Sequence, residues 1–147
     1  MGILLPPRAL ARPTATSLTE VTPTVEATMI SQGLRLRIGP HPDDLCPVEE
    51  LSMGDPIWDI ATNRLVDLET MSCMTLDAAS LQDLGFLPMA LTASGRTGYL
   101  ALSSARIVPS PARRDPGFGP LAFFRLWPET RLVAELEGQA VLIRPTL

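Results

Sequence analysis

Apolar and polar residues alternate strictly over residues 33–38. Leu34, Leu36 and Ile38 fall on one side of this segment, and Arg35 and Arg37 fall on the other. Because successive side chains of a β-strand point to opposite faces, the pattern predicts a half-buried strand. Shorter apolar runs predict further strands at residues 57–60, 65–68, 71–76, 88–92, 99–102, 105–108 and 121–127.

Helical and turn signals separate these runs. Asp77 is placed to cap a short helix that contains Leu81 and ends near Gly85. Residues 48–51 predict at most one helical turn, and residues 94–98 predict a turn between two strands. The last signal is a hairpin that pairs residues 131–136 with residues 139–144 across Glu137 and Gly138.

Composition supports a packed fold that is mainly β. The 147 residues include 15 prolines, 46% are hydrophobic and 19% are charged. Proline removes a backbone donor and stops helices, so a helix bundle is disfavoured. Three regions are predicted: an extended Pro/Thr-rich arm over 1–23, a β-domain over 24–110, and a Pro-rich linker with C-terminal strands over 111–147 that pack on the same domain.

Charge and hydropathy restrict the partners. The net charge is −4, which gives no electrostatic reason to expect nucleic-acid binding. No apolar run approaches the roughly 20 residues that span a membrane, and the apolar run in residues 1–8 is too short for a secretory signal. We therefore expect synthesis in the cytoplasm, no nucleic-acid or membrane partner, and no cofactor.

Residues 47–58, Pro-Val-Glu-Glu-Leu-Ser-Met-Gly-Asp-Pro-Ile-Trp, resemble a block of bacterial Hedgehog/intein (Hint) domains. In that block a strand leads through a short turn and a Gly-Asp bend into the next strand. A second, weaker likeness covers residues 101–108, Ala-Leu-Ser-Ser-Ala-Arg-Ile-Val. Together the matches span about residues 31–110, and they imply a Hint-like β-domain of short strands.

The chemistry of that family is missing from this sequence. Hint domains need a Cys, Ser or Thr nucleophile at the domain start and a Thr-x-x-His block that protonates the leaving amide. The family's usual separation places the first position near Ser31. The only histidine, His41, lies in a Pro-flanked loop rather than in residues 102–108. The resemblance therefore implies a degenerate domain without catalytic residues.

Other candidate constellations are also better explained without chemistry. His41, Asp43, Asp44 and Cys46 match no standard ligand spacing, so we expect a solvated turn and no metal. Alternation places a group of nearby acids on an outer strand face, and an aromatic cluster after the linker suits either core packing or a docking surface. The acids are Asp55, Asp59, Asp67 and Glu69, and the aromatic residues are Phe118, Phe123, Phe124 and Trp127.

The sequence thus favours a non-enzymatic structural or assembly protein that docks to other protein chains through its arm and aromatic surface. An attachment or spike-base component of a phage-like or gene-transfer-agent particle would suit such a chain. Two alternatives stay open: a self-processing Hint-type peptidase that uses Ser31, and a carbohydrate-binding module that stacks sugars on Trp58, Tyr99 or Trp127. The partner, the copy number and the pairing of Cys46 with Cys73 are left open as well, although two buried free thiols are favoured.

Overall fold

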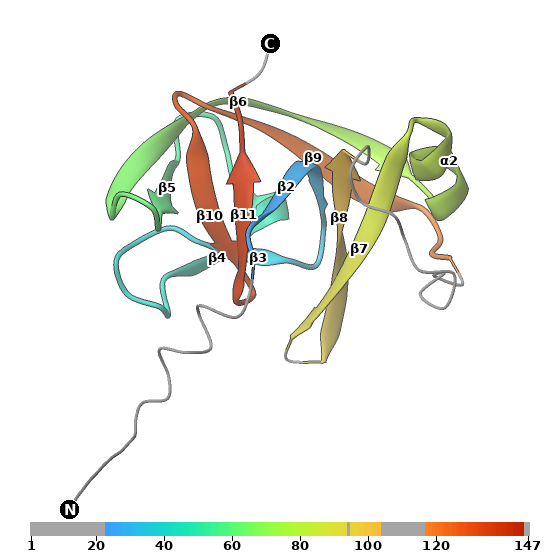
Figure 1. Cartoon of the computed structure of the whole chain (residues 1–147), viewed down its shortest axis with the longest axis horizontal. Coiled ribbons are helices and arrows are strands. Elements are labelled where there is room, and N and C mark those ends of the chain that lie inside the picture. Colours follow the sequence, from blue (N-terminus) through green and yellow to red (C-terminus); the bar gives the residue numbers. More distant parts are fainter. Residues whose placement is uncertain (1–22, 94, 104–116, 146–147) are drawn as a thin grey trace, which may run out of the picture.

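The computed structural model describes residues 23–93, 95–103 and 117–145, which form a mainly β protein with one short α-helix (Figure 1). The predicted mainly β fold, with its single short helix and C-terminal hairpin, is confirmed. The predicted arm up to residue 22, the strand at 105–108 and most of the second Pro-rich segment lie outside the described residues.

The strands vary in length from three to 13 residues. In chain order they are β2 (Val25–Ser31), β3 (Arg35–Arg37), β4 (Leu45–Pro47), β5 (Pro56–Asp59), β6 (Arg64–Leu76), β7 (Phe86–Ala93), β8 (Arg96–Ser103), β9 (Leu121–Pro128), β10 (Leu132–Leu136) and β11 (Gln139–Ile143). A 3₁₀ turn, η1 (Val48–Glu50), precedes β5, and the helix α2 (Ala78–Asp83) follows β6.

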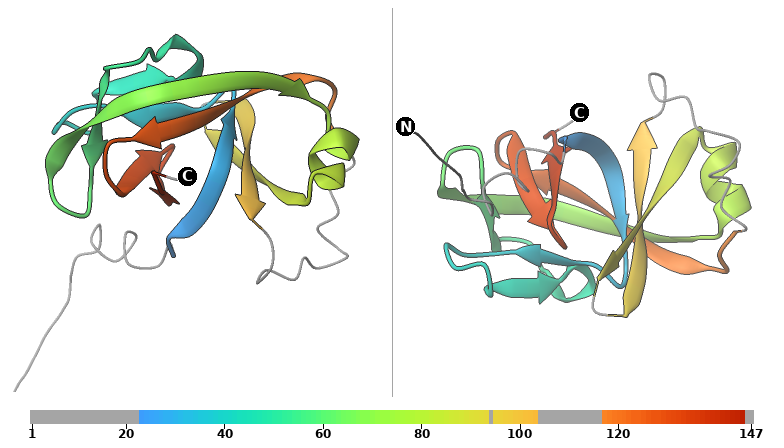
Figure 2. Two further views of the ribbon diagram at one scale, coloured as in Figure 1. Left: turned by 90° about the horizontal axis from the view of Figure 1, so that it is seen from above. Right: turned by 60° about the horizontal axis from the view of Figure 1, so that its bottom comes forward.

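These strands form one strongly curled sheet (Figure 2). The order is β4-β3-β10-β11-β2-β9-β6-β5, with the β7–β8 hairpin joined to β2 through β8. The curl brings the end of β5 back to β10, where the amide of Ile60 donates to the carbonyl of Val133 at 2.9 Å. Strands β9, β10 and β11 lie inside the sheet, so the C-terminal part of the chain completes the domain.

Two hydrophobic cores lie on opposite faces of this sheet because residues alternate between them. Along β9, Leu126 belongs to the inner core, whereas Phe123 belongs to the outer core. The inner core fills the curl and includes Ile30, Leu36, Ile57, Leu68, Leu100, Leu132 and Val141. The outer core consists of Met29, Leu76, Leu81, Ala101 and Phe123, with Phe86, Tyr99, Phe118 and Leu121 packed against it.

Strand β6 differs from its prediction in an informative way. The sequence predicts two strands, at 65–68 and 71–76, but the structure has one strand of 13 residues. Leu68 opposes Pro128 and Thr70 opposes Trp127, so Glu69 is an extra residue that forms a bulge. The bulge changes which side chains face inward, because Val66 and Leu68 contact the inner core before it and Met71 does so after it.

The C-terminal hairpin forms as predicted. Glu137 and Gly138 have φ values of 47° and 87°, as a two-residue hairpin turn with two left-handed positions requires. The Glu137 carboxylate is held by two arginines, since Arg35 and Arg96 both donate to its Oε2 at 3.3 Å. This nearly buried carboxylate joins the hairpin turn to β3 and to the start of β8.

The predicted strand near residue 36 and the turn after η1 also agree with the structure. Leu34 and Leu36 are buried. In the segment resembling Hint domains, Val48 and Leu51 are buried, and the Asp55 carboxylate accepts a hydrogen bond from the amide of Ser52 at 2.8 Å. This local bond closes the bend before β5.

Helix α2 begins with the predicted cap. The Asp77 carboxylate accepts a hydrogen bond from the amide of Ser80 at 2.8 Å, and this bond lowers the pKa of Asp77. Leu81 is fully buried in the outer core, and Gly85 ends the helix region with a φ of 92°. The helix therefore covers one end of the outer face of the sheet.

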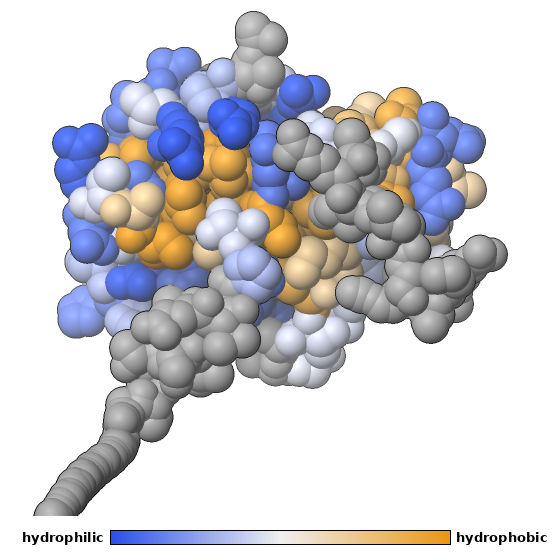
Figure 3. All heavy atoms as spheres, in the orientation of Figure 1, coloured by the Kyte–Doolittle hydropathy of each residue, from blue (hydrophilic) through white to orange (hydrophobic). Residues whose placement is uncertain are grey.

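Apolar side chains are also visible on one outer surface of the sheet. Figure 3 shows them gathered over β10, β11 and β2, with hydrophilic residues around them. Val133 opposes Leu142 in the β10–β11 register, and both are half-buried, whereas their neighbours Leu132, Ala134 and Val141 are buried. Alternation thus leaves an outward apolar pair between the two strands of the hairpin.

The prediction that Asp59 lies on a solvated outer face is wrong. Only 4% of this residue is exposed, and its carboxylate accepts hydrogen bonds from the amides of Ala61 and Val133 and from the hydroxyl of Thr62. Asp59 lies two residues after Ile57, so regular alternation along β5 places it on the same buried face, where it holds β10. A strand of four residues is too short for the sequence alone to show which of its faces is buried.

We expect the Asp59→Ala substitution to lower the free energy of unfolding by about 1–3 kcal/mol, because the amides of Val133 and Ala61 both lose this acceptor. Urea unfolding measures this value. Asp67→Ala is the matched control: Asp67 is exposed in the paired strand, and its loss should change stability by less than about 0.5 kcal/mol. Equal effects of the two substitutions would contradict a role for Asp59 in closing the curl.

Candidate functional site

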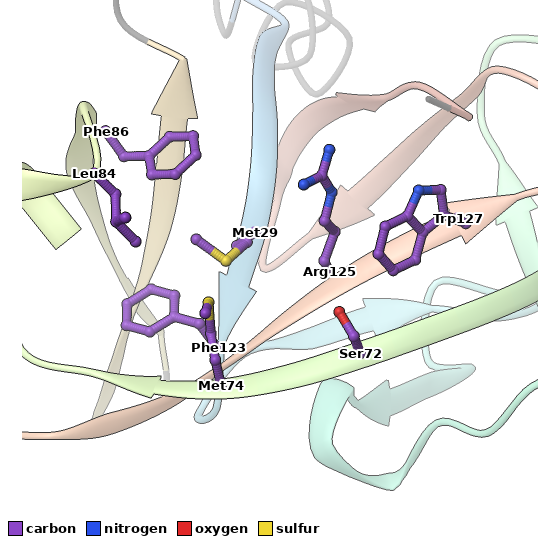
Figure 4. A pocket seen from close by; sticks show the side chains of 8 residues that line it. All are labelled: Met29, Ser72, Met74, Leu84, Phe86, Phe123, Arg125 and Trp127. Carbon is purple, nitrogen blue, oxygen red and sulfur yellow. The ribbon is translucent and has the colours of Figure 1, made fainter. Parts of the chain in front are cut away.

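A hollow of about 430 Å³ lies on the outer face of the sheet, beside the outer core. Figure 4 shows its side chains, which come from β2, β6, β9 and the α2–β7 region. Six are apolar: Met29, Met74, Leu84, Phe86, Phe123 and Trp127. Two are polar: Ser72 and Arg125. The volume lies within the range of about 300–1,000 Å³ that is common for ligand sites.

Alternation along two paired strands builds the floor of the hollow. Phe123, Arg125 and Trp127 are two residues apart on β9, so they share one face. In the register with β6, Ser72 opposes Arg125 and Met74 opposes Phe123. The site therefore has an apolar end at the Met74–Phe123 pair and a polar end at the Ser72–Arg125 pair.

Exposed apolar residues form part of the wall. Met74 is 47% exposed and Leu84 is 54% exposed, and these are two of the four large hydrophobic residues that are strongly exposed in the described part of the chain. Met29 on β2 and Phe123 are buried beneath them. Exposed apolar side chains beside a concave surface are typical of interaction sites.

Arg125 supplies the positive charge of the hollow. Its guanidinium carbon lies 5.0 Å from the centre of the Trp127 ring, in the geometry of a cation–π contact. Within the described residues no carboxylate forms an ion pair with it. The arrangement offers an apolar surface next to a restrained guanidinium group, which suits binding of an apolar group with an anionic neighbour.

Ser31, the candidate nucleophile of the alternative interpretation, is fully buried at the end of β2. Its hydroxyl donates to the carbonyl of Gln32 at 2.8 Å and accepts from the amide of Tyr99 at 2.8 Å. Both interactions are with backbone groups, so the hydroxyl tethers β2 to β8. The hydroxyl proton points to a carbonyl rather than to a base that accepts it.

His41 lies in an exposed turn between β3 and β4. Its amide donates to the Asp44 carboxylate at 3.1 Å, and the amide of Asp44 donates back to the carbonyl of His41. In residues 23–93, 95–103 and 117–145, no three His, Cys, Asp or Glu side chains are grouped to hold a metal ion. The residues around His41 thus form a turn that is closed by hydrogen bonds between its own residues.

The remaining acids of the predicted outer face are not brought together in the hollow. Asp67 and Glu69 are exposed on β6, and Asp55 is engaged in the turn with Ser52. Asp59 holds β10 as described above. None of them lines the hollow.

The aromatic cluster is divided between the core and the rim of the hollow. Phe118 stacks on Tyr99 with ring centres 4.2 Å apart, and Phe123 is fully buried. Phe124 packs against the inner core. Of the predicted cluster, Trp127 is the residue that is both half-buried and on the rim of the hollow. Trp58, a candidate for sugar stacking, lies on β5 with the Arg37 guanidinium over its ring.

The cysteines are both free, and the expectation that both are buried is wrong, because Cys73 is exposed on β6. Cys46 on β4 is half-buried. Burial raises the pKa of the Cys46 thiol, and the carboxylates of Glu50, Asp55 and Glu49 raise it further.

Several residues of the hollow are not predicted from the sequence. Ser72, Met74 and Arg125 become neighbours only through the β6–β9 register, and Met29 belongs to a strand that the apolar pattern does not reveal. The sequence signal that could have indicated the site is the run Phe123, Arg125, Trp127, in which an arginine alternates with two aromatic residues.

Comparison with known proteins adds no relative: no protein-family model matches this sequence, and no curated protein or solved structure is significantly similar to it. Among the described residues, no helix has the length and apolar character needed to cross a membrane.

We expect Cys73 to react with iodoacetamide much faster than Cys46 at pH 8. Cys73 is exposed, whereas the raised pKa of Cys46 reduces its thiolate fraction and burial limits access. Mass spectrometry over time measures the two rates, and the Cys46→Ser and Cys73→Ser variants assign them. A fast reaction that disappears in Cys46→Ser would contradict this order.

Proposed function

We propose that this chain is a non-enzymatic assembly protein that docks a partner polypeptide by receiving one of its apolar side chains in the hollow. The observation that carries the proposal is the composition of the hollow: six apolar side chains, one arginine and one serine. Such a lining favours binding of an apolar group, and it contains no histidine, cysteine or carboxylate to act as an acid, base or reactive thiol.

The surroundings of the hollow support docking of a polypeptide. Met74 and Leu84 are exposed at its rim, so a partner that covers them removes apolar surface from water. Trp127 and Arg125 belong to residue types that are enriched at the centres of protein interfaces. The positive charge of Arg125 also favours a partner segment with acidic character.

A degenerate Hint-like domain is the family interpretation that accompanies this proposal. It depends on the resemblance of residues 47–58 and stays a prediction, as does a place in a phage-like particle. Both are compatible with a docking role, because neither requires a reactive group in the hollow.

The first test separates docking from self-processing. The purified chain and its Ser31→Ala variant should both give one species of full-length mass after prolonged incubation at neutral pH. Intact-mass spectrometry measures this. A cleaved or rearranged species in the parent chain that is missing from Ser31→Ala would overturn the non-enzymatic proposal. A loss of stability alone is expected from Ser31→Ala, because the Tyr99 amide then loses this acceptor.

The second test measures binding in the hollow through Trp127. The chain has two tryptophans, so Trp58→Phe leaves Trp127 as the single reporter. The indole nitrogen of Trp58 is buried with no hydrogen-bond partner, so this substitution breaks no hydrogen bond. An acetylated nonapeptide of Ser and Gly with a central Leu should change Trp127 fluorescence saturably, whereas the same peptide with a central Ser should not.

Two matched variants show where the peptide binds. Leu84→Asp places a charge on the rim of the hollow and should abolish the fluorescence change. Leu65→Asp makes the same substitution at a residue that is 50% exposed near the other end of β6, and it should leave the change intact. An equal loss of the fluorescence change in both variants would contradict the docking proposal. So would the absence of any fluorescence change when the leucine peptide is added to the parent protein.

A further inference from the structure

The arginines of the described residues fall into two groups. Arg35, Arg37, Arg96 and Arg144 each form an ion pair with a glutamate. Arg64, Arg125 and Arg131 form none within the described part of the chain, and of these three only Arg125 is half-buried. Arg125 is therefore the unpaired guanidinium that has already lost part of its hydration.

A second hydrogen-bond donor lies beside it. Ser72 is directly opposite Arg125 in the antiparallel register, and residues in such positions have Cβ atoms about 4.5–5.5 Å apart. The Ser72 hydroxyl has no hydrogen bond to any residue in the described ranges, and it lines the hollow together with Arg125. Two residues with hydrogen-bond donors and no acceptor in the described part of the chain thus lie next to each other at the polar end of the hollow.

The spacing between the two ends of the hollow is fixed by strand geometry. The Met74–Phe123 pair and the Ser72–Arg125 pair are two residues apart on both strands. Because a strand rises 3.2–3.4 Å per residue, the two pairs are separated by about 7 Å. An extended guest peptide has the same distance between residues i and i+2, whose side chains point to the same side.

From this geometry we infer that the hollow recognises a carboxylate, and that the docked segment carries a bulky apolar residue and an Asp or Glu two positions away. The apolar side chain occupies the end formed by Met74 and Phe123. The carboxylate accepts charge-assisted hydrogen bonds from Arg125 and a further bond from Ser72. This inference rests on the docking function proposed above and specifies the chemistry of the partner segment.

The test compares peptides in the Trp58→Phe protein, with Trp127 fluorescence as the readout. All are acetylated and amidated nonapeptides of Ser and Gly. One carries Leu-Ser-Glu, one carries Glu-Ser-Leu, one carries Leu-Glu-Ser, and one carries Leu-Ser-Gln. The tighter of the two spaced glutamate peptides should bind at least about tenfold more tightly than Leu-Ser-Gln. Leu-Glu-Ser should bind no better than Leu-Ser-Gln, because adjacent side chains of an extended chain point to opposite sides.

Variants of the protein assign the preference to Arg125. Arg125→Gln should abolish the difference in affinity between the glutamate and glutamine peptides. Both peptides should still bind through their leucine side chain. Arg131→Gln removes an exposed, unpaired arginine just after β9 and should leave the difference unchanged. Added salt should reduce the difference in affinity between the glutamate and glutamine peptides, because it screens the charges of Arg125 and the peptide carboxylate.

The outcomes separate this inference from the proposed function. Equal binding of Leu-Ser-Glu, Glu-Ser-Leu and Leu-Ser-Gln overturns carboxylate recognition but leaves docking of an apolar side chain in place. A preference for glutamate that does not depend on spacing, or that survives Arg125→Gln, overturns the assigned geometry. Failure of every leucine peptide to bind removes both proposals.

Discussion

Eight residue pairs join β6 to β9, and their register decides which side chains face the inner core and which face the hollow. Along β9, Phe124 and Leu126 face inward, whereas Phe123, Arg125 and Trp127 face outward. A slip of one residue would exchange the two sets, placing a guanidinium group among the aliphatic side chains of the inner core. The burial of both sets of apolar residues thus specifies the register, and the hollow is a direct result of it.

The hollow is built on regular secondary structure. Its floor is formed by the paired strands β6 and β9, and its far wall depends on α2, whose Leu81 anchors the helix in the outer core. Glu137, with its two arginine partners, fixes the hairpin against β3 and β8 on the other side of the sheet. Backbone positions fixed by strand pairing and by an anchored helix are pre-organised, which lowers the entropy cost of binding a guest.

The sequence predicts the local features that depend on a few neighbouring residues. The alternation at residues 33–38, the Asp77 cap and the Glu137-Gly138 turn each have a local physical cause, and each is found in the structure. The central strand β2 and the short β4 are not predicted. Every residue of β2 from Met29 to Ser31 is buried, so its pattern lacks the alternation by which a half-exposed strand is recognised.

The candidate site is less predictable than the fold because it depends on pairing between distant segments. Phe123 and Trp127 belong to an aromatic cluster that is visible in the sequence. Only the register with β6 shows that Trp127 and Arg125 border a hollow and that Phe123 forms its floor. Asp59 is misplaced for the same reason, since its partner Val133 is 74 residues away in the chain. Local patterns carry no information about such contacts.

The bulge at Glu69 has a consequence for how this gene can change. Loss of the Glu69 codon would remove the extra residue and restore regular alternation in β6. Every residue from Thr70 to Leu76 would keep its present face, because Leu68 and Thr70 already lie on opposite faces. Loss of the Ser72 codon would instead shift the residues beyond it by one position, so that Met74 would turn toward the inner core. A change of length in the turn at residues 61–63 would not alter these faces. The tolerance to single-codon deletions should therefore be higher at Glu69 and in the turn at residues 61–63 than in the rest of β6.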